Sequence, residues 1–99
     1  MLFAFSITPA ESGPDGSVHD AVARAVSVVR DCGLPNSTDA MFTTIEGEWD
    51  ECMEVIKKAC EAVQENSARV SLVLKADLRP GYHNELTGKV ERLENALNS

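Results

Sequence analysis

Two segments of the chain alternate between hydrophobic and polar residues, residues 2–8 and residues 69–77. Their apolar positions are Phe3, Phe5, Ile7, Val70, Leu72, Leu74 and Ala76. A period of two residues places such side chains on one face of a β-strand. The pattern therefore predicts two strands, each with one face directed toward a hydrophobic core.

Residues 17–32 carry apolar side chains at helical spacing instead. Ser17 is a suitable N-cap, and Asp20 stands three residues later in the capping-box position. Gly33 is expected to end this helix. The preceding residues, 9–16, contain two prolines and two glycines and are predicted to form a loop.

Two further helices are indicated later in the chain. The second should begin at Asp50 and Glu51, whose charges suit a helix N-terminus, and end near Asn66. Its inner face is predicted to consist of Trp49, Met53, Ile56, Cys60 and Val63. The third follows a turn at residues 79–81, and its narrow apolar stripe is formed by Leu86, Val90, Leu93 and Leu97.

Residues 37–41 and 43–47 are predicted to be two short strands between the first two helices. The resulting order is β-α-β-β-α-β with an additional C-terminal helix. Two crossovers joined through a central hairpin are typical of the split-βαβ, or ferredoxin-like, arrangement. We therefore expect one α+β domain over residues 1–99, with a four-stranded antiparallel sheet and the first two helices on one face.

The other face of this sheet is predicted to be mixed and mostly small or polar. It should carry Ala4, Ser6, Thr8, Thr44, Glu46, Ser71, Val73, Lys75 and Asp77. Such a face could be a subunit contact or one wall of a ligand pocket. Alternatively, Glu46 and Lys75 could simply pair across the sheet, which would stabilise it by a few tenths of a kcal/mol.

Composition narrows the class of function. The net charge of −7 and the lack of a basic stripe disfavour nucleic-acid binding. No apolar run approaches the ~20 residues of a membrane span. The three cysteines lie in helical patterns without metal-ligand spacing, which suggests reduced thiols in the cytoplasm and no metal site.

Candidate chemistry is concentrated at the corner between the third strand and the second helix. Thr44 and Glu46 share a strand face, and the only tryptophan, Trp49, opens the helix. Hydroxyl, carboxylate and indole groups there could hold a small polar or cationic ligand. They could equally form a well-capped helix start. Asp77 and Arg79 close the last strand, either as a local ion pair or as ligand contacts.

The run Thr43-Thr44-Ile45-Glu46-Gly47-Glu48-Trp49-Asp50-Glu51 resembles the central motif of the thiamine-binding protein family. Weaker matches are Gly16-Ser17-Val18, Arg69-Val70, Asp77 with Arg79, and Lys89-Val90-Glu91. The resemblance covers nearly the whole chain. It implies a ferredoxin-like subunit that forms dimers and tetramers, through sheet contacts, and binds thiamine or its hydroxymethylpyrimidine half without an established reaction.

If the ligand-binding residues of the family are carried over to the matching motif positions, those of this chain would be Thr44, Glu46, Trp49, Asp77 and Arg79. Ser6 is added to this set because it lies on the same face of the sheet, the face that the first two helices leave uncovered. The acidic chain suits a cationic vitamin, whereas a phosphorylated form would need a basic cradle. No catalytic residue or cofactor is expected beyond this ligand.

Two other functions fit the same residues. The chain could be a dimeric ferredoxin-like enzyme of the monooxygenase or isomerase type, although no base with an activated partner is evident. It could also be a structural or regulatory oligomer whose polar sheet face contacts another subunit. The fold itself hosts many functions.

Overall fold

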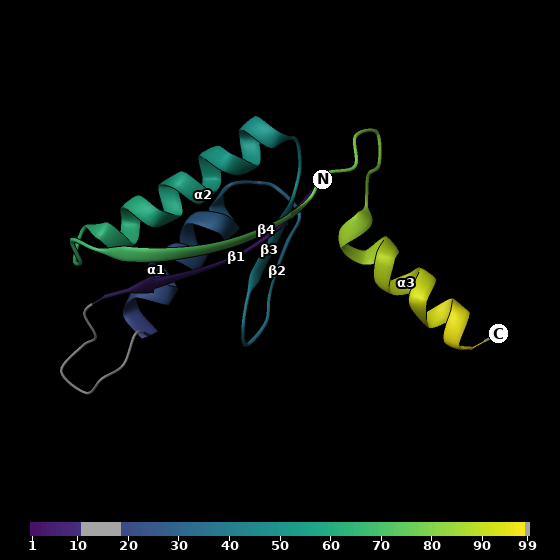
Figure 1. Cartoon of the computed structure of the whole chain (residues 1–99), viewed down its shortest axis with the longest axis horizontal. Helices are drawn as coiled ribbons and strands as arrows, with labels where there is room; N and C mark the ends of the chain where they lie inside the picture. Colours follow the sequence, from purple (N-terminus) through teal and green to yellow (C-terminus); the bar gives the residue numbers. More distant parts are fainter. Residues whose placement is uncertain (11–18, 99) are drawn as a thin grey trace.

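The structure is a computed structural model that describes residues 1–10 and 19–98. Its elements, in chain order, are β1 (Leu2–Pro9), α1 (His19–Asp31), β2 (Asn36–Thr38), β3 (Thr43–Glu46), α2 (Trp49–Gln64), β4 (Val70–Asp77) and α3 (Glu85–Leu97) (Figure 1). The expected N-cap at Ser17 and most of the expected loop 9–16 lie outside the described residues.

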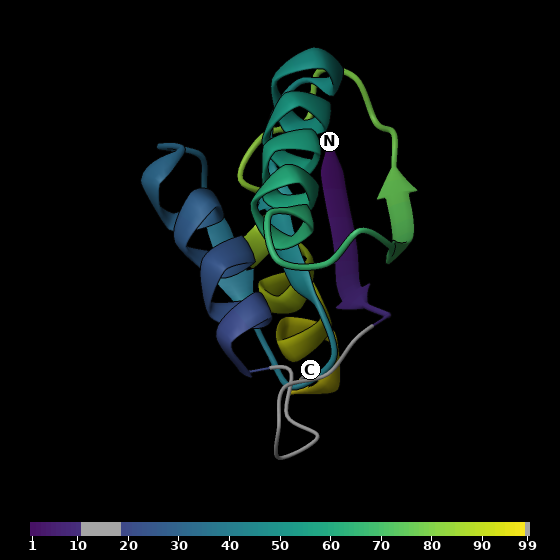
Figure 2. The same cartoon turned by 90° about the vertical axis from the view of Figure 1, so that its left-hand side faces the viewer.

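The four strands form one antiparallel sheet in the order β2-β3-β1-β4. Helices α1 and α2 lie together on one face, and α3 lies on the far side of the sheet (Figures 1 and 2). This is the predicted ferredoxin-like α+β arrangement. The fold class is therefore confirmed, including the additional C-terminal helix.

Strand register confirms the two faces that alternation predicts. Phe3 pairs with Ile45 and Ala76, and Phe5 pairs with Leu74, so these side chains share the helix-bearing face. Phe3 and Ile45 are fully buried there. The opposite side of the sheet is its open face. It carries Leu2, Ala4, Ser6, Thr8, Ser37, Thr44, Glu46, Ser71, Val73, Lys75 and Asp77.

The inner face of α2 differs from the prediction. The buried residues of this helix are Cys52, Val55, Ile56, Ala59 and Val63. Met53 and Cys60 are half-buried and pack against this core, so they lie at the edge of a buried face that is wider than the predicted stripe. Because α2 packs against both α1 and β1, the small residues Cys52 and Ala59 face the contact and the bulkier Met53 lies at its edge.

The connection between β2 and β3 is a short turn organised by Asp39. Its Oδ1 atom accepts hydrogen bonds from the backbone N–H groups of Met41 and Phe42, both at 2.8 Å. These donors lower the pKa of the Asp39 carboxyl, because they stabilise its charged form. The strands are shorter than the predicted 37–41 and 43–47 because this turn occupies residues 39–42.

Helix α3 projects from the body of the molecule (Figure 1). The radius of gyration is 15.0 Å, above the ~13 Å of a compact domain of about 100 residues. Three residues of its predicted apolar stripe, Val90, Leu93 and Leu97, are 56%, 57% and 70% exposed. The stripe therefore exists, but only Leu86 at its start is half-buried.

Gly47 connects β3 to α2 where space is limited. A Cβ atom at this position would lie 2.6 Å from Glu51 Oε1 and 3.0 Å from Cys52 Sγ. The same Glu51 Oε1 accepts the backbone N–H of Glu48, the N-cap of α2, at 2.8 Å. A side chain at residue 47 would push the Glu51 carboxylate out of this capping contact.

We expect Gly47→Ala to lower the free energy of unfolding by about 1 kcal/mol, the usual effect of a lost helix cap. Urea denaturation measures this change. Gly88→Ala is the control, because its Cβ meets only Arg92 Nη1 at 3.4 Å within a helix. That substitution should leave stability unchanged or raise it by up to ~1 kcal/mol. Equal effects of the two substitutions would contradict the role of Gly47.

Candidate ligand-binding groove

The buried carboxylate of Glu46 ties α3 to the sheet. Its Oε2 atom accepts the backbone N–H of Glu85 at 2.7 Å, and Oε1 accepts that of Leu86 at 3.2 Å. The first N–H groups of a helix have no intrahelical partner. The local N-cap, Asn84, makes no side-chain capping bond. Glu46, 6% exposed, therefore caps α3 from a strand far away in the sequence.

Two charged contacts reinforce this attachment. Lys89 of α3 forms an ion pair with Asp77 at the end of β4, and this contact lowers the pKa of the Asp77 carboxyl. Within α3, Arg92 pairs with the buried Glu85 and lowers the pKa of its carboxyl. Glu46 and Asp77 thus use their carboxylates to hold α3 against the open face.

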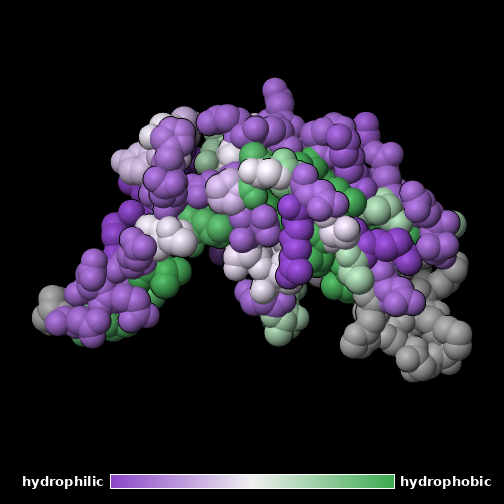
Figure 3. Space-filling model, turned by 180° about the vertical axis from the view of Figure 1, so that it is seen from behind, coloured by the Kyte–Doolittle hydropathy of each residue, from purple (hydrophilic) through white to green (hydrophobic). Residues whose placement is uncertain are grey.

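A groove of about 480 Å³ lies between the open face and the start of α3. It is lined by Leu2, Ala4, Thr44, Lys75, Ala76, Asp77 and Lys89. In the space-filling view, a hollow separates α3 from the rest of the molecule (Figure 3). The groove has the volume of small-molecule sites, which are typically ~300–1,000 Å³.

Strand register arranges the polar groups of the groove in two rows. In the first row, Leu2 pairs with both Glu46 and Asp77, the two carboxylates that hold α3. In the second row, Ala4 pairs with both Thr44 and Lys75. Neighbouring strands are ~4.8 Å apart, so a hydroxyl and an ammonium group flank the small Ala4 side chain. The second row offers hydrogen-bond donors to a ligand above Ala4.

The structure brings together only some of the residues expected to bind a ligand. Thr44 and Asp77 line the groove, and Glu46 lies beside it. Arg79 lies in the loop after β4, with its guanidinium 3.5 Å from the centroid of the Tyr82 ring. Ser6 lines a different cavity.

Trp49 lies away from the groove. Its ring contacts Phe3 edge-on, with centroids 5.7 Å apart, and Phe3 belongs to the core on the other face of the sheet. The indole is 45% exposed, so it is neither fully core nor part of the groove. The structure therefore does not bring Trp49 together with Glu46 as a cation-binding pair. Nor do Glu46 and Lys75 form an ion pair within the described residues, because Glu46 binds α3.

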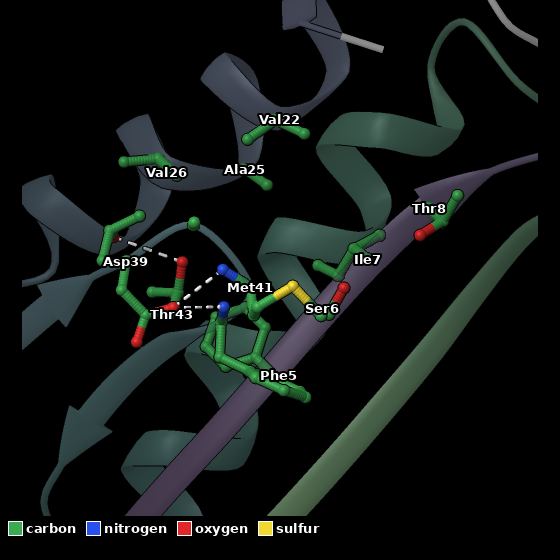
Figure 4. Close-up of a pocket in the computed structure, with 13 residues that line it drawn as sticks. Phe5, Ser6, Ile7, Thr8, Val22, Ala25, Val26, Asp39, Met41 and Thr43 are labelled. Atoms are coloured by element: carbon green, nitrogen blue, oxygen red, sulfur yellow. Dashed lines mark hydrogen bonds between the residues drawn. The ribbon is translucent and has the colours of Figure 1, made fainter.

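The cavity that includes Ser6 is smaller, about 210 Å³, and lies between α1, β1 and the β2–β3 turn. Val22, Ala25 and Val26 of α1 form one wall, and Met41 reaches from the turn toward β1 (Figure 4). The Asp39 carboxylate is already bonded within the turn. The small volume of this cavity makes it a weaker candidate than the groove.

Sequence reasoning did not include in the site five of the residues that line the groove, Leu2, Ala4, Lys75, Ala76 and Lys89. Alternation had placed Ala4 and Lys75 on the open face, so the signal for them was present in their shared register position. Lys89 could not be found in this way, because its position depends on how α3 folds back through the Glu46 contact.

No group of three His, Cys, Asp or Glu side chains within the described ranges is placed to bind a metal ion. In the same part of the chain, every helix is too short or too polar to cross a bilayer.

The three cysteines are free thiols, and burial raises the pKa of Cys52 to about 11. Its thiol is therefore protonated at neutral pH.

Together these features define a small ferredoxin-like protein with an open-face groove bounded by a C-terminal helix. Residues 3–94 match the family model described as thiamine-binding protein. The chain belongs to the thiamine-binding protein family. It is 50% identical to a UPF0045 protein of Mycobacterium bovis, over 98% of this chain and 94% of the relative.

Solved structures show the same fold. A hypothetical protein of Methanocaldococcus jannaschii superposes with a TM-score of 0.83 and 31% identity, covering 94% of both chains. A candidate thiamine biosynthesis or salvage protein of Thermotoga maritima superposes with a TM-score of 0.76 and 25% identity. That match covers 92% of this chain and 97% of the other.

We expect Glu46→Gln to loosen α3, because the amide cannot supply two charged acceptors to the helix N-terminus. Tryptic cleavage after Lys89 and Arg92 should become about tenfold faster, equivalent to ~1.4 kcal/mol of lost docking free energy. Mass spectrometry of timed digests measures the rates.

Glu54→Gln is the matched control, because Glu54 is exposed and lies 4.0 Å from Lys58 in a surface ion pair. This substitution should leave cleavage in α3 unchanged. Equal cleavage rates in the two variants would show that Glu46 does not hold α3.

Proposed function

We propose that this protein is a cytoplasmic, non-enzymatic binding protein for thiamine or its hydroxymethylpyrimidine half, and that the groove beside α3 is the binding site. The observation that carries the proposal is a groove of about 480 Å³ with free hydrogen-bond donors in a member of the thiamine-binding protein family. The likeness to the Thermotoga maritima protein supports the same class of ligand.

The lining of the groove suits a flat heteroaromatic ligand. Leu2 and Ala4 offer an apolar floor, and the small side chain of Ala4 leaves room above the central strand. Thr44 can donate to or accept from a pyrimidine nitrogen or amino group. In this proposal Glu46 acts by holding α3, Asp77 and Arg79 lie at the edge of the site, and Ser6 and Trp49 lie outside it.

We further propose that the protein acts as a homodimer or homotetramer. Val90, Leu93 and Leu97 form an apolar stripe on a projecting helix, next to an open sheet face. Exposed apolar patches of this kind commonly mark contacts between proteins. A second copy of the chain could cover the stripe and the open face together, and would enclose a groove that a single subunit leaves open.

The contacts of the acidic groups beside the groove favour a binding role over catalysis. Both carboxylates beside the groove are engaged with α3, so neither is free to act as a general base. The thiol of Cys52 is buried and protonated. The proposal therefore predicts that bound ligand is recovered chemically unchanged.

Isothermal titration calorimetry with thiamine and with hydroxymethylpyrimidine tests the proposal. We expect saturable binding of at least one of them, by a species whose mass is a multiple of 10.7 kDa. Ala4→Leu should weaken binding at least tenfold, because the larger side chain fills the groove. Chromatography of the ligand after incubation should show no product.

Ala23→Leu adds the same atoms at an exposed position of α1 and serves as the control. It should bind like the unchanged protein. Full affinity in Ala4→Leu would place the ligand elsewhere, and absence of binding by both compounds would contradict the proposed function.

A further inference from the structure

The charges around the groove are more evenly balanced than those of the whole chain. The protein carries nine basic residues and a net charge of −7. Four of the nine, Lys75, Arg79, Lys89 and Arg92, gather near the groove and the start of α3. Arg79 and Lys89 both act electrostatically on Asp77 and on Glu85. Glu46, Asp77, Glu85 and Glu91 lie among them, so this edge of the molecule is close to balanced in charge, unlike the acidic chain as a whole.

The three carboxylates nearest the groove, those of Glu46, Asp77 and Glu85, already have partners within the protein. Glu46 accepts two backbone N–H groups of α3. Asp77 is paired with Lys89, and Glu85 is paired with Arg92. A cationic ligand would have to displace α3 or one of these pairs before it could reach a free carboxylate.

Lys75 is the exception among the charged side chains that line the groove. It has no ion-pair or hydrogen-bond partner among the described residues, whereas Asp77 and Lys89 have each other. Thr44, two strands away in the same row, likewise has a hydroxyl free of partners in the part of the chain that the structure describes. The uncompensated charge of the groove is thus positive, with a neutral donor opposite it.

From this arrangement we propose that the groove binds a ligand through an anionic group, such as a phosphate ester, seated above Ala4 between Lys75 and Thr44. The inference rests on the proposed function and specifies which form of the ligand is preferred. Lys75 supplies the charge and the Thr44 hydroxyl supplies a directed hydrogen bond. Lys89, at the wall of the groove, is paired with Asp77, so this pair adds no net charge.

The inference reverses the expectation drawn from net charge alone. An overall charge of −7 suits a cationic vitamin, but recognition depends on charges within about a Debye length of the ligand, ~8 Å at physiological salt. Beside the groove, Glu46 and Asp77 are bonded to α3, whereas Lys75 has no partner among the described residues. The phosphorylated form of the pyrimidine or of thiamine should therefore bind more tightly than the unphosphorylated form.

Calorimetric titrations of hydroxymethylpyrimidine, its phosphate ester and inorganic phosphate test this inference. We expect the ester to bind at least tenfold more tightly than the free alcohol, and the advantage to shrink as salt is raised. Lys75→Gln should abolish most of the advantage, so that the ratio of the two affinities falls close to one whatever the affinity for the free alcohol. Lys57→Gln, at an exposed site on α2, is the matched control and should change neither affinity.

Each outcome separates the inference from the proposed function. Equal affinity for ester and alcohol, or equal effects of Lys75→Gln and Lys57→Gln, would overturn the inference and leave the binding function intact. If neither pyrimidine compound nor thiamine binds, the proposed function fails. Binding of inorganic phosphate that Lys75→Gln abolishes would in that case still support an anion site.

Discussion

The contact between the Glu46 carboxylate and the first turn of α3 is the interaction on which the groove depends. Glu46 accepts the N–H groups of Glu85 and Leu86, which lie about 40 positions later in the sequence. The N-cap residue, Asn84, makes no side-chain capping bond that could replace this contact. Apolar burial contributes little here, since most of the stripe on α3 is exposed. A polar cap and an ion pair therefore position a whole helix, and the helix in turn forms one wall of the site.

This use of acidic residues accounts for the charge of the groove, in which the side chain left without a partner among the described residues is a lysine. Carboxylates that satisfy a helix N-terminus or a lysine are no longer available to attract a cation. Among the described residues, the groove is left with the unpaired Lys75, the Thr44 hydroxyl and the apolar side chains of Leu2 and Ala4. The charge of the groove thus depends on which charged groups are paired within the folded protein, and not on the net charge of the chain.

Much of the fold could be predicted from the sequence, because period-two alternation in β1 and β4 and the helical patterns between them reflect burial directly. The inner face of α2 was predicted in part: Ile56 and Val63 are buried as expected, but the small residues Cys52 and Ala59 were not predicted to be buried beside them. The site was harder to predict. Glu46 was identified as important, but only the folded chain shows α3 as its partner. Trp49 looked like a ligand contact because it is close to Glu46 in sequence, yet the start of α2 turns it toward the core side of the sheet.

Amide hydrogen exchange at Glu85 and Leu86 tests the central claim most directly. The first N–H groups of a helix normally exchange quickly, because they lack an intrahelical acceptor. If Glu46 caps α3 as the structure shows, both amides should be protected in the unchanged protein, together with the later turns of the helix. Exchange at the rate of an unstructured peptide at these two amides would contradict the cap and, with it, the account of the groove.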